Sequence, residues 1–205
     1  MKKKAGARRN IFLVSIAAIV ISTFVLAEGI LLMSNQPFDA DDPMLFLSLG
    51  DFLYNNGMTG YAVKIYERAE ELDPDNPAIL NNFGIAYITS DEEKAEGYFL
   101  KAMTINPEYE LARKNLAILY NKQEKYDKAA EQLLILTNLH PENIQYNYDL
   151  AINLAHKFYY ISKSKEDVEL SLKYLYKVQS LSPGFERTEE NIQLLEEILK
   201  VMEGN

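Results

Sequence analysis

The chain has 205 residues and a formal net charge of −9, with no cysteine and only two histidines. Its length suits one domain, and the lack of cysteine excludes disulfides, thiolate metal sites and a cysteine nucleophile. Five lysines and arginines and no acid lie in the first ten residues, which leaves sixteen basic and thirty acidic residues, a balance of −14, for the rest. So acidic a body disfavours binding to nucleic acid or to anionic lipid headgroups.

Residues 11–33 form a nearly continuous apolar segment after this basic tail of residues 1–10. As a helix the segment would measure about 34 Å, enough to cross a hydrocarbon core of about 30 Å. Glu28 is its one charged residue, and a position near the far headgroups lowers the cost of that charge. The basic tail predicts a cytoplasmic N-terminus. The sequence therefore predicts a transmembrane signal anchor; a signal peptide cleaved near Ala27 is the alternative.

An acidic linker, residues 34–42, separates this segment from the body of the chain. Asp42 and Pro43 at its end are suited to the N-cap and the first turn of a helix.

From there on, small or apolar residues and a proline recur four times. In every copy the last four of these anchors lie 4, 3 and 5 residues apart, and successive prolines lie 33, 34 and 42 residues apart. The copies are Gly50, Ala62, Tyr66, Ala69 and Pro74; Gly84, Ala95, Phe99, Ala102 and Pro107; Ala117, Ala129, Leu133, Leu136 and Pro141; and Ala151, Ser171, Leu175, Val178 and Pro183. A period near 34 residues is typical of repeated pairs of antiparallel helices.

The small anchors are expected to have a steric role. Gly50, Gly84, Ala117 and Ala151 would let the first helix of each pair approach the second closely, while Tyr66, Phe99 and Leu133 fill the space between layers.

Residues 43–185 resemble four tetratricopeptide repeats, at about 43–76, 77–109, 110–143 and 144–185. The third copy is the clearest, with its residues 116–120 and 125–129 and its closing Pro141. The second copy is one residue short between its helices, where residues 90–93 read as a capping box. The fourth has eight extra residues, which we interpret as a longer first helix through residues 158–161 and a turn at residues 162–164.

The resemblance implies an all-α solenoid of about four helix-turn-helix repeats. Residues 186–205 would form a C-terminal capping helix, since repeat arrays need one to cover their last apolar face. The stripe expected on this helix is Ile192, Leu195, Leu199 and Met202.

The family binds other proteins with the surface that the first helices line, so the resemblance also implies a peptide-binding groove. The expected groove residues are Leu47, Asp51, Tyr54, Asn81, Asn82, Ile85, Ile88, Lys114, Asn115, Ile118, Asn121, Tyr148 and Ile152. Asn82 and Asn115 occupy the position whose amide often contacts a peptide main chain in this family. The alternative is that both asparagines only follow the repeat consensus and that the isoleucines pack locally.

No catalytic residue, cofactor or metal site is predicted, because His140 and His156 belong to no ligand or nucleophile spacing. The sequence predicts a single-pass protein of a bacterial inner membrane, with a cytoplasmic N-terminus and a periplasmic repeat domain. It would be a scaffold or adaptor of an envelope machine, with other envelope or membrane-complex proteins as partners and no small-molecule substrate. The alternative is a soluble exported adaptor or chaperone.

Overall fold

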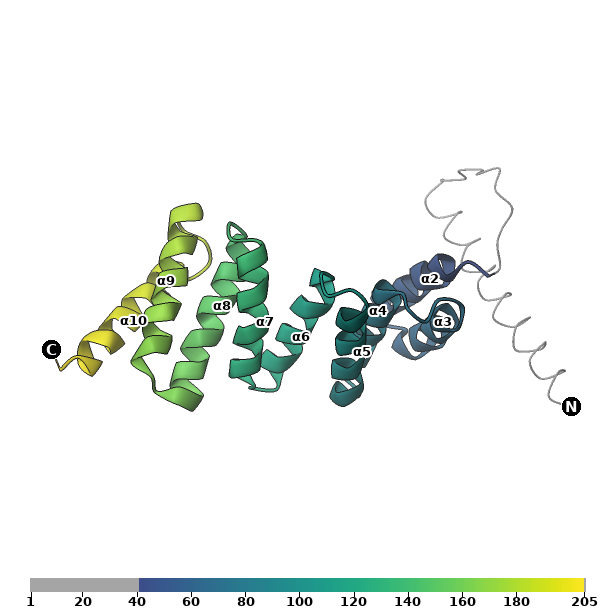
Figure 1. Ribbon diagram of the computed structural model, residues 1–205, viewed down its shortest axis with the longest axis horizontal. Coiled ribbons are helices and arrows are strands. Elements are labelled where there is room, and N and C mark those ends of the chain that lie inside the picture. The colour runs from purple at the N-terminus through teal and green to yellow at the C-terminus, as the bar shows by residue number, and fades with distance from the viewer. Residues whose placement is uncertain (1–40, 205) are drawn as a thin grey trace, which may run out of the picture. The chain divides into compact units, whose positions relative to one another are not determined.

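The computed structural model describes residues 41–204, and the regular structure of this part of the chain is entirely helical. The helices are α2 (Pro43–Asn55), α3 (Thr59–Leu72), α4 (Pro77–Tyr87), α5 (Glu92–Ile105), α6 (Glu110–Lys122), α7 (Tyr126–Leu139), α8 (Ile144–Lys157), η1 (Phe158–Ser162), α9 (Lys165–Leu181) and α10 (Thr188–Met202) (Figure 1). They confirm the predicted all-α fold, with one helix pair inside each expected repeat range.

Two compact units make up the chain, one ending at Pro74 and the other beginning at Asp75. None of the helices between residues 41 and 204 is both long enough and apolar enough to span a membrane. The basic tail, the predicted span at residues 11–33 and most of the linker lie outside the described residues.

The helices α2, α4, α5 and α8 begin at a residue whose side chain caps the first turn. The Asp42 carboxylate accepts a hydrogen bond from the Met44 amide at 2.9 Å, with Pro43 in the first turn. The capping box predicted at residues 90–93 is wrong in register, because Asp91 is the N-cap and accepts from the Lys94 amide at 3.1 Å. Ser90 still belongs to the preceding turn, where its amide donates to the Tyr87 carbonyl.

In the first unit, α2 and α3 pack together through a close approach at Gly50. A Cβ atom at Gly50 would lie 2.2 Å from a ring atom of Tyr66, which is 2% exposed. The Tyr66 hydroxyl donates to the Asp51 carboxylate at 2.7 Å, and burial together with that carboxylate raises the pKa of Tyr66. The predicted steric role of Gly50 is therefore confirmed.

In the second unit the same contact joins α4 to α5. A Cβ atom at Gly84 would lie 2.4 Å from the ring of Phe99, whose side chain is fully buried. Alanine replaces glycine in the next two pairs, where Leu133 and Leu175 take the place of the ring and lie in a common buried cluster with Ala117 and Ala151. The larger the residue of the second helix, the smaller is its counterpart on the first.

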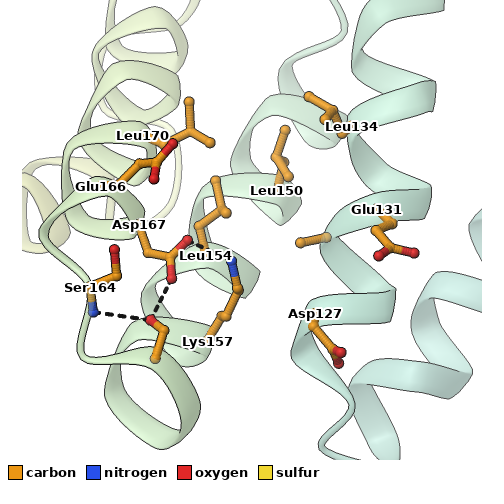
Figure 2. Close-up of a pocket in the computed structure, with 12 residues that line it drawn as sticks. Asp127, Glu131, Leu134, Leu150, Leu154, Lys157, Ser164, Glu166, Asp167 and Leu170 are labelled. Atoms are coloured by element: carbon orange, nitrogen blue, oxygen red, sulfur yellow. Dashed lines mark hydrogen bonds and ion pairs between the residues drawn. The ribbon is translucent and has the colours of Figure 1, made fainter.

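The insertion in the fourth repeat includes a π-helical turn of five residues, η1, that continues α8. Lys163 then adopts a left-handed conformation with φ of 52° before α9 begins. Asp167 holds this turn in place, because its buried carboxylate lies 2.7 Å from Lys157 Nζ and also accepts from the Ser162 hydroxyl (Figure 2). The predicted turn is confirmed, and the predicted helical extension has π geometry.

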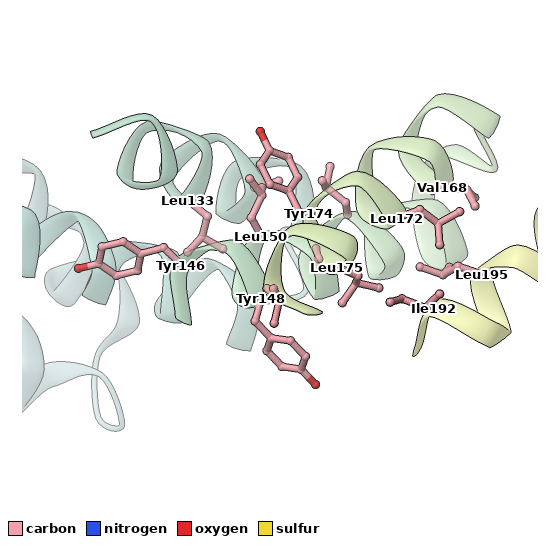
Figure 3. Close-up of a cluster of buried hydrophobic side chains, with 14 of the residues drawn as sticks. Leu133, Tyr146, Tyr148, Leu150, Val168, Leu172, Tyr174, Leu175, Ile192 and Leu195 are labelled. Atoms are coloured by element: carbon pink, nitrogen blue, oxygen red, sulfur yellow. The ribbon is translucent and has the colours of Figure 1, made fainter. Parts of the chain in front are cut away.

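The core of the second unit consists of two successive clusters of buried side chains. One cluster of buried side chains extends over α4 to α7, and the next continues over α6 to α10 (Figure 3). Ile192 and Leu195 of α10 close this second cluster, as expected of a capping helix. Met202, predicted to share their stripe, is instead 39% exposed at the end of the helix.

We expect Gly84→Ala to destabilise the chain by about 1–3 kcal/mol, because the added methyl group overpacks a fully buried ring. The matched control is Gly97→Ala on the exposed side of α5, where a Cβ would meet nothing within 4 Å; it should instead stabilise the chain by about 0.5–1 kcal/mol. Urea unfolding of the full chain in detergent, followed by circular dichroism, measures both changes.

The double variant Gly84→Ala/Phe99→Leu reproduces the pairing that the third repeat uses. It should cost at least about 1 kcal/mol less than the two single changes added together, since neighbouring substitutions couple when one relieves the other. If the two changes in the free energy of unfolding simply add, the size of the residue at position 84 does not depend on the residue at position 99.

Candidate functional site: the inner face

The first helices of the second unit are joined by side-chain amides. Asn115 Nδ2 of α6 donates to Asn81 Oδ1 of α4 at 2.8 Å, and Asn121 Nδ2 of α6 donates to Asn153 Oδ1 of α8 at 2.8 Å. Asn191 Nδ2 of α10 donates to the Tyr148 hydroxyl of α8 at 3.3 Å. These bonds, which we call the amide rungs, define one surface shared by α4, α6, α8 and α10, the inner face.

Several predicted groove residues are accessible on this face. Ile118 is 50% exposed, and the others that keep partial exposure are Asn82, Ile85, Ile88, Lys114, Asn115, Asn121 and Ile152. Ile85, Ile118 and Ile152 occupy equivalent positions of three successive repeats. The accessible part of the inner face is thus aliphatic, with amides beside it.

Other predicted groove residues are not available as open surface. Leu47 and Asn81 are 5% and 2% exposed, so the expectation that their side chains face a groove is wrong. Leu47 is one of the buried residues of α2. The buried Asn81 amide accepts a hydrogen bond from Asn115 Nδ2 and donates one to Asn82 Oδ1 at 2.9 Å. In the first unit, Tyr54 is partly exposed and the Asp51 carboxylate already accepts from Tyr66.

A hollow of about 390 Å³, which we call the inner pocket, lies between α8 and α10. Two predicted residues, Tyr148 and Ile152, line it, although Tyr148 is largely buried by an edge-on contact with Phe185. The other lining residues are Ala155, His156, Phe158, Tyr159, Tyr160, Arg187, Asn191, Leu194, Leu195 and Ile198. Its walls are mainly aromatic and aliphatic, and few charged groups reach it.

His156 sits at the base of an aromatic group beside this pocket. Its ring centroid lies 5.0 Å from that of Tyr126 and 6.1 Å from that of Tyr160. Burial lowers the pKa of His156, and its buried Nδ1 has no hydrogen-bond partner among the described residues. Burial therefore favours the neutral form of this imidazole.

Charged residues of α6 and α8 have polar or charged partners. Burial raises the pKa of Asp149, while the Gln145 amide and Lys114 of the neighbouring helix act in the opposite direction. Farther along, Lys122 Nζ donates to the Ile88 carbonyl at 2.8 Å and lies 2.8 Å from Glu92. The contacts of Lys122 connect the third repeat to the second.

Sequence reasoning missed several exposed apolar residues on this surface. Leu111 is 54% exposed and precedes Ile118 by seven residues, so both lie on one side of α6; that spacing could have indicated it. Leu194 and Tyr160 are 56% and 62% exposed at the inner pocket. They come from the capping helix and the π-helical turn, whose contribution to the face depends on tertiary packing.

The second histidine, His140, has a structural contact. Its Nε2 lies 2.5 Å from Glu110 Oε1, which links the end of α7 to the start of α6. Across residues 41–204, no group of three or more histidine, aspartate or glutamate side chains is arranged to hold a metal ion.

The family model described as tetratricopeptide repeat matches residues 45–76, which is the α2–α3 pair. This part of the chain is therefore a tetratricopeptide repeat. Among curated relatives, the peroxisomal targeting signal receptor of Kluyveromyces lactis is 33% identical over 106 residues, which are 50% of this chain and 19% of that protein. The photosystem I assembly protein Ycf3 of Prochlorococcus marinus is 28% identical over 135 residues, 57% of this chain and 78% of that one.

Solved structures show the same fold. MamA aligns with a TM-score of 0.58 at 20% identity over 69% of this chain and 73% of its own. YrrB, described as a TPR protein with an unusual peptide-binding site, aligns with a TM-score of 0.65 at 17% identity over 78% of this chain and 79% of its own. These likenesses show that the described residues have the fold of a tetratricopeptide solenoid.

The Asn115–Asn81 rung should stabilise the stacking of the second and third repeats. Asn81→Ala is expected to cost about 1–3 kcal/mol, because it leaves a partly buried amide of Asn115 unpaired. Asn138→Ala, at an exposed asparagine of α7, is the control and should change stability by less than about 0.5 kcal/mol. Urea unfolding compares them, and equal effects would show that the rung contributes nothing.

Proposed function

We propose that this chain is a membrane-anchored scaffold or adaptor of a bacterial envelope machine, which binds a peptide or helix of another protein on the inner face. The observation that carries the proposal is the inner pocket, a hollow of about 390 Å³ with aromatic and aliphatic walls. Pockets of this size and character fit one or two apolar side chains. Ile118 and Leu111 extend the apolar surface on the same set of helices.

The amides beside the stripe supply polar contacts for a peptide main chain. Asn115 uses one amide hydrogen for the rung to Asn81, and an amide group has a second hydrogen and an acceptor oxygen. Because Asn115 is partly exposed, these remaining groups can pair with a peptide N–H and carbonyl. Main-chain pairing gives affinity, and pockets for side chains give specificity.

The membrane setting rests on the sequence. The basic tail and the apolar residues 11–33 support a signal anchor with the body outside the cytoplasm. The acidity of the body supports a partner that is a protein, since anionic lipid and nucleic acid would be repelled. One curated relative is an assembly protein, which is in keeping with a role in building a complex.

Replacing Ile118 with serine tests the inner face. This exposed change should leave the fold intact but reduce recovery of the partner at least fivefold in a crosslinking pull-down from membranes, because it removes apolar contact area. Ile135→Ser on α7, at a side chain that is 40% exposed, is the matched control and should recover the partner normally. Equal recovery with both variants would remove the inner face as the binding surface.

Carbonate extraction and intact-mass measurement test whether residues 11–33 act as a transmembrane signal anchor. We expect the full-length chain to stay with the membrane pellet, as a spanning helix of 23 residues requires. A soluble fragment that begins at Glu28 would favour the second candidate, an exported adaptor or chaperone released near Ala27.

A further inference from the structure

A second hollow, which we call the outer pocket, lies between α7, α8 and α9 and has a volume of about 340 Å³ (Figure 2). Its more accessible apolar walls are Leu134 of α7 and Leu170 of α9, and its floor on α8 is formed by Leu150 and Leu154, which are only 1% and 4% exposed. At 100° per residue, these two side chains project from α8 on the side opposite to Ile152. The outer pocket is therefore separate from the inner face.

The outer pocket combines an apolar floor with an acidic mouth. Ala130, Leu134 and Leu170 extend the apolar surface that the two leucines of α8 begin. Asp127 and Glu131 project from α7 on one side, and Glu166 projects from α9 on the other (Figure 2). All three acids are exposed, and none has an ion-pair partner among the described residues.

The one cation that lines the pocket does not offset these acids. Lys157 Nζ lies 2.7 Å from Asp167 Oδ1, and this carboxylate is buried and also accepts from the Ser162 hydroxyl. The charge of Lys157 is thus neutralised within the pocket wall. Nearby Lys165 is paired with Glu169 at 3.2 Å and with Glu203 at 2.8 Å. Three uncompensated negative charges remain around the mouth.

We propose that the outer pocket binds an arginine or lysine side chain from a segment of a partner protein. The methylene groups of such a side chain can lie on leucines while its charged end stays at the water-exposed rim. Here the rim presents carboxylates from two helices, and arginine, whose planar group has five donors, can pair with more than one of them. A wholly apolar side chain would gain the floor but leave the acids without compensation.

This proposal does not rest on the inner face as a binding site. It adds a second docking surface on the opposite side of α8, with different chemistry. The inner face is mainly aliphatic with amides beside it, whereas the outer pocket selects for positive charge. A scaffold with both surfaces could hold two protein segments at once.

The test uses the full ¹⁵N-labelled chain in detergent micelles and two peptides, acetyl-Ala-Leu-Arg-Leu-Ala-amide and the same peptide with Gln in place of Arg. We expect the Arg peptide to bind at least tenfold more tightly and to shift the amide signals of Asp127, Glu131 and Glu166. Raising the salt concentration should weaken the binding of the Arg peptide, since exposed charges are screened. Equal affinity of the two peptides, or shifts confined to other helices, would overturn the proposal.

Two triple variants test whether the acids of the outer pocket bind the Arg peptide. Asp127→Asn/Glu131→Gln/Glu166→Gln should lose at least tenfold in affinity for the Arg peptide. The control Glu93→Gln/Glu142→Gln/Glu197→Gln changes the net charge by the same amount at exposed acids outside the pocket, and its affinity should stay within twofold of the parent. Equal losses would assign the binding to overall charge.

The same titration tests whether the apolar side chains of the pocket contribute to binding. It also tests whether the bound cation belongs to a protein or to a free polyamine. Leu134→Ser, at a side chain that is 39% exposed, should weaken the Arg peptide at least threefold while the circular dichroism spectrum stays unchanged. Spermidine should compete poorly because it lacks the leucine side chains of the peptide. If spermidine binds more tightly than the Arg peptide, the pocket belongs to a free polyamine and the proposal is wrong.

Discussion

The architecture depends on a close contact between a small residue of one helix and a large side chain of the next. Where the second helix carries Tyr66 or Phe99, the first has glycine, because even a methyl group would overlap the ring. Where the second helix carries leucine, alanine fits. This complementarity sets how closely the two helices of a pair approach, and within the second unit the pairs stack on their neighbours.

Stacking of this kind gives the second unit two chemically different surfaces. The first helices are joined by the amide rungs and present isoleucines between them, whereas the outer pocket has leucines of α7 and α9 beside acids of the same two helices. Because α8 contributes to both pockets, a single helix separates them. The capping helix α10 closes the core and also forms one wall of the inner pocket.

The features predicted best from the sequence are those that depend on local spacing. The anchors at Gly50 and Gly84, the N-cap at Asp42 and the position of α10 follow from residue size, capping chemistry and helical periodicity. Inner-face residues were harder to assign, since neighbouring positions on a helix differ by 100° and Asn81 turned out to be buried. The outer pocket was not predicted, because it unites residues from three helices that are as far apart in sequence as Asp127 and Leu170.

The central claim is that closely packed helix pairs stack in series and present their first helices as a docking surface. The chain has no cysteine, so Ile118→Cys and Ile135→Cys each give one thiol for a benzophenone photocrosslinker, at exposed positions of α6 and α7 respectively. Irradiation in native membranes followed by mass spectrometry of the adducts should yield a partner peptide joined at position 118 and none at position 135. The same partner joined only at position 135 would contradict the account.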